Sequence, residues 1–157
     1  MGLPVVFSVT SPAESFLHPQ HFLNKFQFAD DHERQYVRKI AKLALSNKCR
    51  IYLLTNEVDT VYGFVALSIA STISMPCVVV DYLFTSLPYR KLHYAELDNR
   101  KVSEHLLDVA VIIAREVDAR LPVHYIALQP AHEKLENFYQ MFEFKRLHIK
   151  EWMFLRI

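Results

Sequence analysis

Residues 124–147, HYIALQPAHEKLENFYQMFEFKRL, indicate a strand, a helix and a second strand in succession. Prolines at positions 122 and 130 bound the β-prone residues 124–128, because proline donates no amide hydrogen bond and restricts the residue before it. Apolar side chains then recur at the i, i+3, i+4 and i+7 spacing of one helix face, which predicts a helix that buries Leu135, Phe138, Tyr139 and Phe142. Residues 144–147 are expected to return as a strand.

The segment ENFYQMFEF, residues 136–144, resembles the C-terminal region of the GCN5-related N-acetyltransferase (GNAT) family, in which a helix carrying a Phe-Tyr pair precedes a strand that opens on Phe. The resemblance implies that Tyr139 lies beside the thioester sulfur of acetyl-CoA and protonates the departing thiolate. A phenol with a reference pKa of about 10 stays protonated at neutral pH, as this role requires. The residues alone leave a second interpretation open, in which Tyr139 is a half-buried core residue next to Phe138.

Length and composition predict one soluble domain spanning residues 1–157. The chain has a mass of 18.4 kDa and 52% apolar residues, enough for a substantial core. No uncharged apolar run reaches the roughly 18 residues that a membrane span needs. The start of the chain lacks a basic segment followed by a long apolar core, so a cytoplasmic location is the default expectation.

The net charge, the cysteines and the histidines indicate which kinds of partner the protein can bind. The formal net charge of +1 lacks the basicity that favours binding along a nucleic-acid backbone, so nucleic acid is expected only as a carrier of the acceptor, if at all. Cys49 and Cys77 are too few for a disulfide framework, and the eight histidines show no metal-ligand spacing. We therefore expect reduced thiols and no metal.

The order of expected elements predicts an α/β (α+β) fold. Strands are expected at residues 5–9, 50–55, 61–70, 77–86 and 151–157, with a polar turn at 56–60 and no assignment for 11–29. Asp30 and Asp31 can cap a helix whose apolar face is Val37, Ile40, Ala41 and Ala44, and a longer apolar helix is expected over residues 102–119. This order is similar to that of the GNAT family, which implies a mixed, mostly antiparallel central sheet with helices on both faces.

Two further segments resemble GNAT strands. VYGFVAL, residues 61–67, looks like the family's third strand, in which Gly63 would mark either a tight turn entry or a close backbone approach. DYLFTSLPYRK, residues 81–91, resembles the strand that splays from its neighbour in that family. The resemblance implies that this strand offers the backbone edge of Leu83, Phe84 and Thr85 to the pantetheine arm of CoA.

The family's phosphate loop is the point at which this sequence departs most from the pattern. That loop runs as Arg or Gln, two residues, Gly, one residue, and Gly or Ala, and its main-chain amides bind pyrophosphate at a helix N-terminus. The only glycines here are Gly2 and Gly63, so the loop has none. Arg90 matches its first position. Its end fits residues 100–103 if residues 92–99 are an insertion, with Lys101 and Ser103 in place of the glycines.

This alignment implies a set of contacts to acetyl-CoA. Four cations are available for its phosphates, namely Arg90, Lys91, Arg100 and Lys101. Val102 and Ser103 supply main-chain amides near the helix start. Asn137, in the later helix, is a contact by its family position. In the alternative interpretation the cations belong to a solvated loop and Asn137 is an exposed polar residue. Asp81 is the expected general base, although Glu57, Glu14, the histidines and a simple paired-carboxylate role for Asp81 remain open.

The sequence thus predicts an N-acetyltransferase that moves the acetyl group of acetyl-CoA to an amine. The alternative is a catalytically silent GNAT-like module that binds CoA or a protein. A small amine, an antibiotic, a peptide terminus, a lysine and a charged tRNA all remain open as acceptors. A homodimer is one expectation for its assembly.

Overall fold

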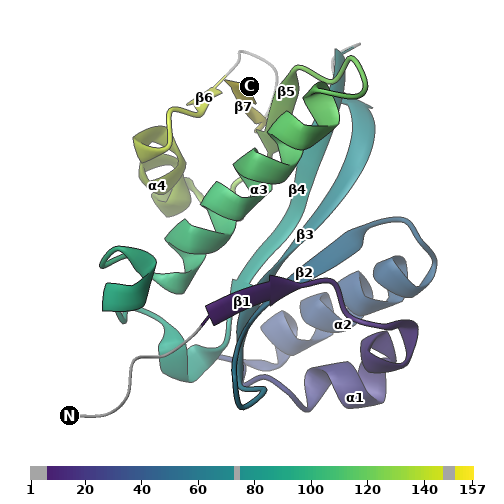
Figure 1. The fold of residues 1–157 in the computed structure, drawn as a ribbon, viewed down its shortest axis with the longest axis vertical. Coiled ribbons are helices and arrows are strands. Elements are labelled where there is room, and N and C mark those ends of the chain that lie inside the picture. Colours follow the sequence, from purple (N-terminus) through teal and green to yellow (C-terminus); the bar gives the residue numbers. More distant parts are fainter. Residues whose placement is uncertain (1–6, 73–74, 147–150) are drawn as a thin grey trace. The chain divides into compact units, whose positions relative to one another are not determined.

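A computed structural model describes residues 7–72, 75–146 and 151–157 (Figure 1). Its strands are hydrogen-bonded in the order β1-β2-β3-β4-β5-β7-β6. The β4–β5 pair is parallel, whereas the β1–β2, β2–β3, β5–β7 and β6–β7 pairs are antiparallel. The prediction of an α/β fold with a mixed, mostly antiparallel sheet is confirmed.

Contacts divide the chain into two compact units. The first unit consists of residues 1–67 and 81–109, and the second of residues 68–80 and 110–157. Two strands and one helix, namely β3 (Val61–Thr72), β4 (Met75–Thr85) and α3 (Val102–Asp118), contribute residues to both units. The single domain expected from the sequence, like the homodimer, stays a prediction.

Seven elements of the described chain lie entirely within the first unit. They are β1 (Phe7–Thr10), the 3₁₀ helix η1 (Glu14–Leu17), α1 (Pro19–Leu23), α2 (Asp31–Leu45), β2 (Arg50–Asn56) and the 3₁₀ helices η2 (Leu87–Tyr89) and η3 (Ala95–Leu97). The segment left without assignment thus holds η1 and α1. The predicted strand at 5–9 appears as β1, which continues to Thr10, and Val5 and Val6 lie outside the described part.

Helix α2 begins where the sequence predicts. Asp30 is its N-cap, and its Oδ1 accepts a hydrogen bond of 2.8 Å from the amide of Glu33. Glu33 in turn accepts from the amide of Ala29 at 3.0 Å through Oε1. The first hydrogen bond satisfies an amide that the first turn of the helix leaves without a partner, and the second satisfies the amide of the residue just before the cap.

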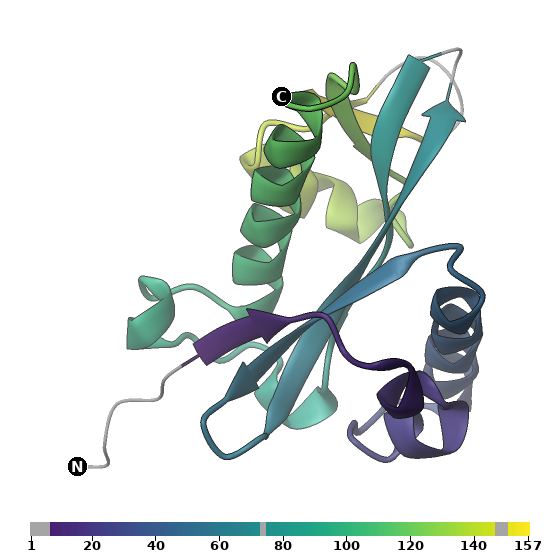
Figure 2. The same cartoon turned by 45° about the vertical axis from the view of Figure 1, so that its right-hand side comes forward.

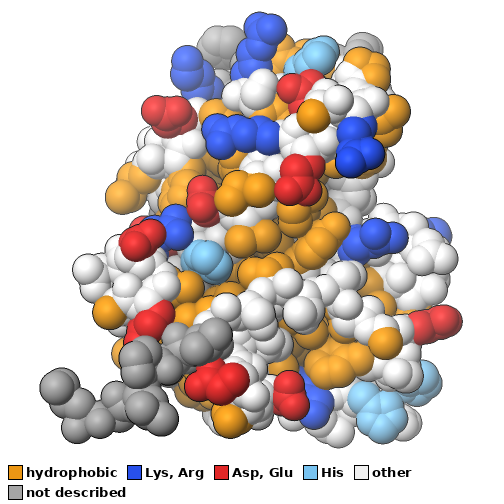
Figure 3. All heavy atoms as spheres, in the orientation of Figure 1, with side chains coloured by type: hydrophobic (Ala, Val, Ile, Leu, Met, Phe, Trp, Pro, Cys, Tyr) orange, Lys and Arg blue, Asp and Glu red, His pale blue; other side chains and the backbone are white. Residues whose placement is uncertain are grey.

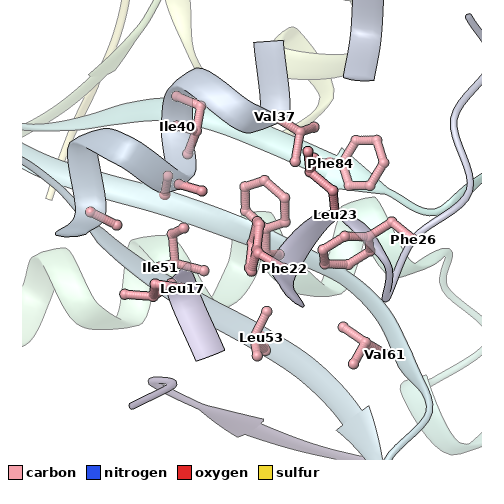
Figure 4. Packing of buried hydrophobic residues seen from close by; sticks show 14 of the residues in the cluster. Leu17, Phe22, Leu23, Phe26, Val37, Ile40, Ile51, Leu53, Val61 and Phe84 are labelled. Atoms are coloured by element: carbon pink, nitrogen blue, oxygen red, sulfur yellow. The ribbon is translucent and has the colours of Figure 1, made fainter. Parts of the chain in front are cut away.

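The apolar face of α2 covers the core of the first unit. Val37, Ile40, Ala41 and Ala44 are all buried, as the helical spacing predicts. They pack with aromatic residues of α1, the following turn and two strands (Figure 4), among them Phe22, Phe26, Phe64 and Phe84. The ring centroids of Phe26 and Phe84 are 5.3 Å apart, and those of Phe64 and Phe84 are 5.4 Å apart. This core fixes the C-terminal part of β4 against α1 and α2.

Gly63 lies at a tight approach of β3 to β4. The β2–β3 register shifts between Leu54 and Thr55, opposite this position. A Cβ atom on Gly63 would lie 2.3 Å from the carbonyl oxygen of Phe84 and 3.1 Å from Cα of Thr85. Of the two roles that the sequence left open for this glycine, the close backbone approach is the one present.

The second unit contains the C-terminal elements (Figure 2). They are β5 (Tyr125–Leu128), the 3₁₀ helix η4 (Glu133–Leu135), α4 (Glu136–Met141), β6 (Lys145–Arg146) and β7 (Met153–Arg156), with β7 paired between β5 and β6. One buried cluster in this unit is formed by Cys77, Val79, Ala127 and Phe154. The predicted strand–helix–strand order of residues 124–147 is present, although α4 is only one and a half turns long and Leu147 lies outside the described residues.

Two kinds of feature are absent from the described residues. No helix among them is long and apolar enough to cross a membrane. They also contain no group of three or more His, Cys, Asp or Glu side chains arranged to hold a metal ion.

Candidate active site

Strand β4 runs past the end of its parallel partner. The β4–β5 register pairs Cys77 with Tyr125 and ends with Val80 opposite Leu128, whereas β4 continues to Thr85. Leu83, Phe84 and Thr85, the residues predicted to contact pantetheine, all lie in this extension. On the β3 side, the amide of Ser86 donates to the carbonyl of Tyr62 at 2.9 Å. Hydrogen-bonding direction alternates along a strand, so the main chain of Thr85 faces the opposite edge.

Asp81 is the first residue of this extension. Its side chain is half-buried. Burial, and then the charge of Asp81, raise the pKa of the Cys49 thiol to about 11, which indicates that the carboxylate lies close enough to oppose a thiolate there. Cys49 is therefore a neutral core residue near neutral pH. The role of Asp81 as a general base stays a prediction.

The side chain of Arg90 contacts other residues of the first unit. Its Nε donates to the carbonyl of Thr85 at 2.7 Å, and its Nη2 forms an ion pair with Oε1 of Glu33. Cζ lies 5.4 Å from the ring centroid of Phe84. Lys91, the next residue, has an exposed side chain and a positive φ of 68°. Of these two predicted phosphate contacts, only the lysine therefore projects into solvent.

The proposed insertion at residues 92–99 is a compact loop closed at its base. The amide of Tyr94 donates to the carbonyl of Arg100 at 3.1 Å, and the amide of Asn99 donates back to Tyr94 at 2.9 Å. Asp98 and Asn99 take the left-handed conformation, and Leu97 is buried. These hydrogen bonds join Tyr94 of the insertion to Arg100, the first residue of the second half of the expected phosphate loop.

Arg100 also has partners within its own region. Its Nε donates to the carbonyl of Leu97 at 3.0 Å, and Nη1 lies 3.5 Å from Oδ2 of Asp108. Nη2 lies 3.3 Å from Nδ1 of His105. Burial and then the nearby Arg100 hold the pKa of His105 below its usual value, so the imidazole is neutral and can accept from the guanidinium. The guanidinium thus lies beside the first and second turns of α3, where His105 and Asp108 engage it.

The start of α3 offers main-chain donors together with a competing carboxylate. Val102 is buried, and Lys101, Ser103 and Glu104 are half-buried. The first amides of an α-helix have no acceptor within the helix and favour anions. Here the amide of Lys101 donates to Oε1 of Glu104 at 3.1 Å, so a carboxylate of the chain already occupies one donor. Glu104 is a site residue that the sequence reasoning missed; the Lys-x-x-Glu spacing of a capping box could have indicated it.

Tyr139 is buried in α4, and Asn137 is exposed on the same helix. The side chain of Tyr139 packs between aromatic rings, with centroid distances of 5.1 Å to Phe138 and 6.1 Å to Phe144. The whole residue is 6% exposed, and this burial raises the pKa of the phenol to about 12. The phenol therefore remains protonated throughout the neutral range. It can donate a hydrogen bond, whereas complete proton loss is unfavourable.

Comparison with solved structures identifies the architecture. A crystal structure of AtaTR bound with AcCoA has a TM-score of 0.77 and 13% identity, covering 96% of this chain and 92% of that chain. AtaT complexed with acetyl-methionyl-tRNAfMet has a TM-score of 0.74 and 12% identity, with 96% and 95% coverage. A structure described as a bacterial toxin has a TM-score of 0.76 and 18% identity, with 99% and 92% coverage. The fold is the GNAT fold. No protein-family model and no curated protein matches the sequence.

Within this fold, the elements that the sequence predicts for an acyl-CoA site are present, whereas several of their side chains depart from the family pattern. The strand extension, the loop before α3 and the tyrosine of α4 are all present. The loop lacks glycines, both of its arginines have acidic partners, and Glu104 lies at the helix start. Phosphate binding by these residues stays a prediction.

The raised pKa of Tyr139 predicts a specific alkaline sensitivity. The folded state holds the phenolic proton to about pH 12, whereas the unfolded chain releases it near pH 10. The stabilisation is therefore complete below pH 10 and lost as the pH rises from 10 to 12. Two pKa units correspond to about 3 kcal/mol. Urea unfolding at pH 8, 10 and 11 should show a smaller alkaline loss for Tyr139→Phe than for the wild type. Equal losses would show that the phenol ionises freely in the folded protein.

Proposed function

We propose that this protein is an acetyl-CoA-dependent N-acetyltransferase. The observation that supports this function best is the extension of β4 beyond its pairing with β5, within a GNAT fold that also buries a tyrosine in the helix after β5. A backbone edge without a strand partner can hydrogen-bond an extended pantetheine arm, as an added strand would. A solved neighbour of the same fold is described as bound with AcCoA.

The residues of the expected phosphate loop fit acetyl-CoA in part. The first amides of α3, at Val102 and Ser103, suit a diphosphate, and Lys91 and Lys101 can add positive charge. Arg90 and Arg100 would have to leave their carboxylate partners to join them. Glu104 would repel a diphosphate unless its carboxylate moves from the Lys101 amide. Binding through amides and lysines is therefore the mode that the side chains favour.

The proposed reaction is direct transfer. A neutral amine attacks the thioester carbonyl, a C–N bond forms, the C–S bond breaks, and the electrons of that bond remain on the CoA sulfur. Asp81 is the proposed acceptor of the amine proton. Tyr139 is proposed to donate a hydrogen bond to the thiolate as charge develops on sulfur. A phenol with a pKa of about 12 stabilises a thiolate by hydrogen bonding more readily than by giving up its proton.

The acceptor can be proposed at the level of a class. One neighbour of the same fold is described as complexed with acetyl-methionyl-tRNAfMet, and this makes the amino group of an aminoacyl-tRNA the first acceptor to test for this chain. The net charge is only +1, and basic and acidic side chains are interspersed on the face seen in Figure 3. A tRNA acceptor would therefore have to be recognised near its aminoacyl end more than along its backbone.

The direct test is binding of acetyl-CoA by the purified protein, measured by calorimetry and by thermal stabilisation. We expect saturable binding that the Lys91→Gln/Lys101→Gln double variant weakens by about tenfold, because two phosphate contacts are lost. Arg38→Gln, a charge loss at an exposed position of α2, is the matched control and should leave the affinity unchanged. Absence of binding by the wild type would refute the proposed function.

A catalytically silent module is the second candidate, and the glycine-free loop with its carboxylate favours it. Acetyl transfer to methionyl-tRNA, other aminoacyl-tRNAs, peptides and polyamines separates the two candidates. Free thiol release in the presence of an acceptor supports the enzyme. Acetyl-CoA binding without transfer to any of these acceptors supports the module.

A further inference from the structure

The insertion at residues 92–99 is attached to two strands of the first unit through the side chain of Tyr94. The centroid of its ring lies 5.3 Å from that of Phe7 in β1 and 5.8 Å from that of Tyr62 in β3, both in edge-to-face arrangements. The rings of Phe7 and Tyr62 also contact each other, with centroids 5.0 Å apart. Tyr62 is buried and Tyr94 is half-buried. Aromatic pairs of this kind stabilise a contact beyond the area that they bury, so the ring of Tyr94 is an anchor for the insertion.

The main chain of Tyr94 holds the insertion closed. Its carbonyl accepts from the amides of Leu97 at 3.0 Å and Asn99 at 2.9 Å, and its amide donates to the carbonyl of Arg100 at 3.1 Å. The Nε of Arg100 donates in turn to the carbonyl of Leu97, whose side chain is buried. The residue whose ring packs on the strands thus also supplies the backbone groups that close the loop.

A second tyrosine anchors the chain on the other side of Lys91. The ring centroid of Tyr89, in η2, lies 4.6 Å from that of Tyr62. Lys91 lies between Tyr89 and Tyr94 in the sequence, and the rings of both tyrosines contact Tyr62. The side chain of Lys91 is exposed, whereas its main chain is restrained from both sides.

The loop adopts left-handed backbone conformations without glycine. Lys91, Asp98 and Asn99 have φ angles of 68°, 57° and 61°. Glycine is the usual residue at such positions, and aspartate and asparagine are the side chains that tolerate them best. A residue held in this region persists there only when its surroundings impose the conformation. The tyrosine contacts on both sides of Lys91 are surroundings of this kind.

We propose that Tyr94 is a positioning residue for the diphosphate of acetyl-CoA. Its ring, fixed on Phe7 and Tyr62, holds the glycine-free loop in one conformation before the ligand arrives. That conformation sets the place of Lys91 and of residues 100–103, which follow the insertion. A loop that is already ordered does not have to be ordered at the binding step, so the anchor contributes to affinity without touching the ligand. This inference rests on the proposed function, which supplies the diphosphate.

The test compares acetyl-CoA with S-acetylpantetheine, which carries the same thioester arm without phosphates, each titrated by NMR into the full chain. We expect Tyr94→Leu and Phe7→Leu each to weaken acetyl-CoA binding about fivefold and to leave S-acetylpantetheine affinity within about twofold of the wild type. The double variant should resemble either single variant, because the two rings act as a unit. Tyr94→Phe keeps the ring and should retain both affinities. Tyr36→Leu, which removes an exposed tyrosine ring from α2, is the matched control and should leave both unchanged.

Asn99 tests the backbone conformation separately. Asn99→Gly keeps the left-handed conformation at no steric cost, whereas the β-branched side chain of Asn99→Val opposes it. We expect the glycine variant to match the wild type and the valine variant to lose acetyl-CoA affinity about fivefold. Equal losses in the two variants would show that the asparagine side chain acts by itself, and would overturn the part of the inference that concerns backbone conformation.

Hydrogen exchange at the amides of Leu97 and Asn99 measures the anchoring itself, with no ligand present. Exchange at both amides should accelerate in Tyr94→Leu and Phe7→Leu, while the amide of Glu33 in α2 keeps its rate. Unchanged exchange, unchanged acetyl-CoA affinity in Tyr94→Leu, or an equal loss for the two thioesters would each overturn the inference. If the wild type binds neither thioester, the proposed function is refuted, whereas the exchange rates still decide whether Tyr94 fixes the loop.

Discussion

Replacing Tyr139 with phenylalanine should lower the turnover of acetyl transfer by about 100-fold, at the lower end of the roughly 10²–10⁴-fold that a positioned proton donor contributes. The dissociation constant for acetyl-CoA should change by less than about twofold, because the substitution removes one hydroxyl that acts on a charge present only during reaction. Single-turnover measurements with a saturating acceptor, beside calorimetry with acetyl-CoA, give the two values separately.

The surroundings of Tyr139 make this a clean substitution. Phenylalanine keeps the ring that packs against Phe138 and Phe144, so stability at neutral pH should change by less than about 0.5 kcal/mol. Tyr125→Phe, which removes the hydroxyl of a half-buried residue of β5, is the control and should retain full turnover. Unchanged turnover in Tyr139→Phe would establish the alternative interpretation of Tyr139 as a core residue.

Replacing Gly63 with alanine should lower the free energy of unfolding by about 3 kcal/mol or more, at the upper end of the cost of overpacking. The added Cβ would lie 2.3 Å from the carbonyl oxygen of Phe84, and the next obstacle is Cα of Thr85 at 3.1 Å. Both obstacles are backbone atoms of β4, so no side-chain rotation relieves the contact. Gly63 has no positive φ, so the cost comes from space and not from backbone conformation.

Urea denaturation at neutral pH measures this loss. Ser68→Ala, farther along β3 at a half-buried position, is the control and should stay within about 0.5 kcal/mol of the wild type. Because Thr85 belongs to the strand extension, acetyl-CoA affinity should also fall in Gly63→Ala if the proposed function holds. A loss of stability below about 1 kcal/mol would mean that β3 and β4 can separate at this point at little cost.

Local patterns predicted the helices and most strands well. The expected helix at 102–119 is Val102–Asp118, and the cap at Asp30 begins α2 with the predicted buried face. These features follow from spacing and capping within a few residues, where backbone geometry fixes which side chains share a face. The stripe at Leu135 to Phe142 was less reliable. It is divided between a 3₁₀ turn and the short α4, because apolar spacing does not determine which helical hydrogen bonds form.

The sequence by itself determined the order of elements, the resemblance to the GNAT family, the tight position of Gly63 and the absence of loop glycines. Only the tertiary structure decided the partners of the charged residues. Arg90 pairs with Glu33, Arg100 with Asp108, and Glu104 occupies a helix-start amide. A guanidinium accepts any nearby carboxylate or phosphate of suitable geometry, and the nearest anion to Arg90 comes from a helix 57 residues earlier. Strand pairing and core packing bring the two side chains together, and the spacing of residues along the sequence does not predict this contact.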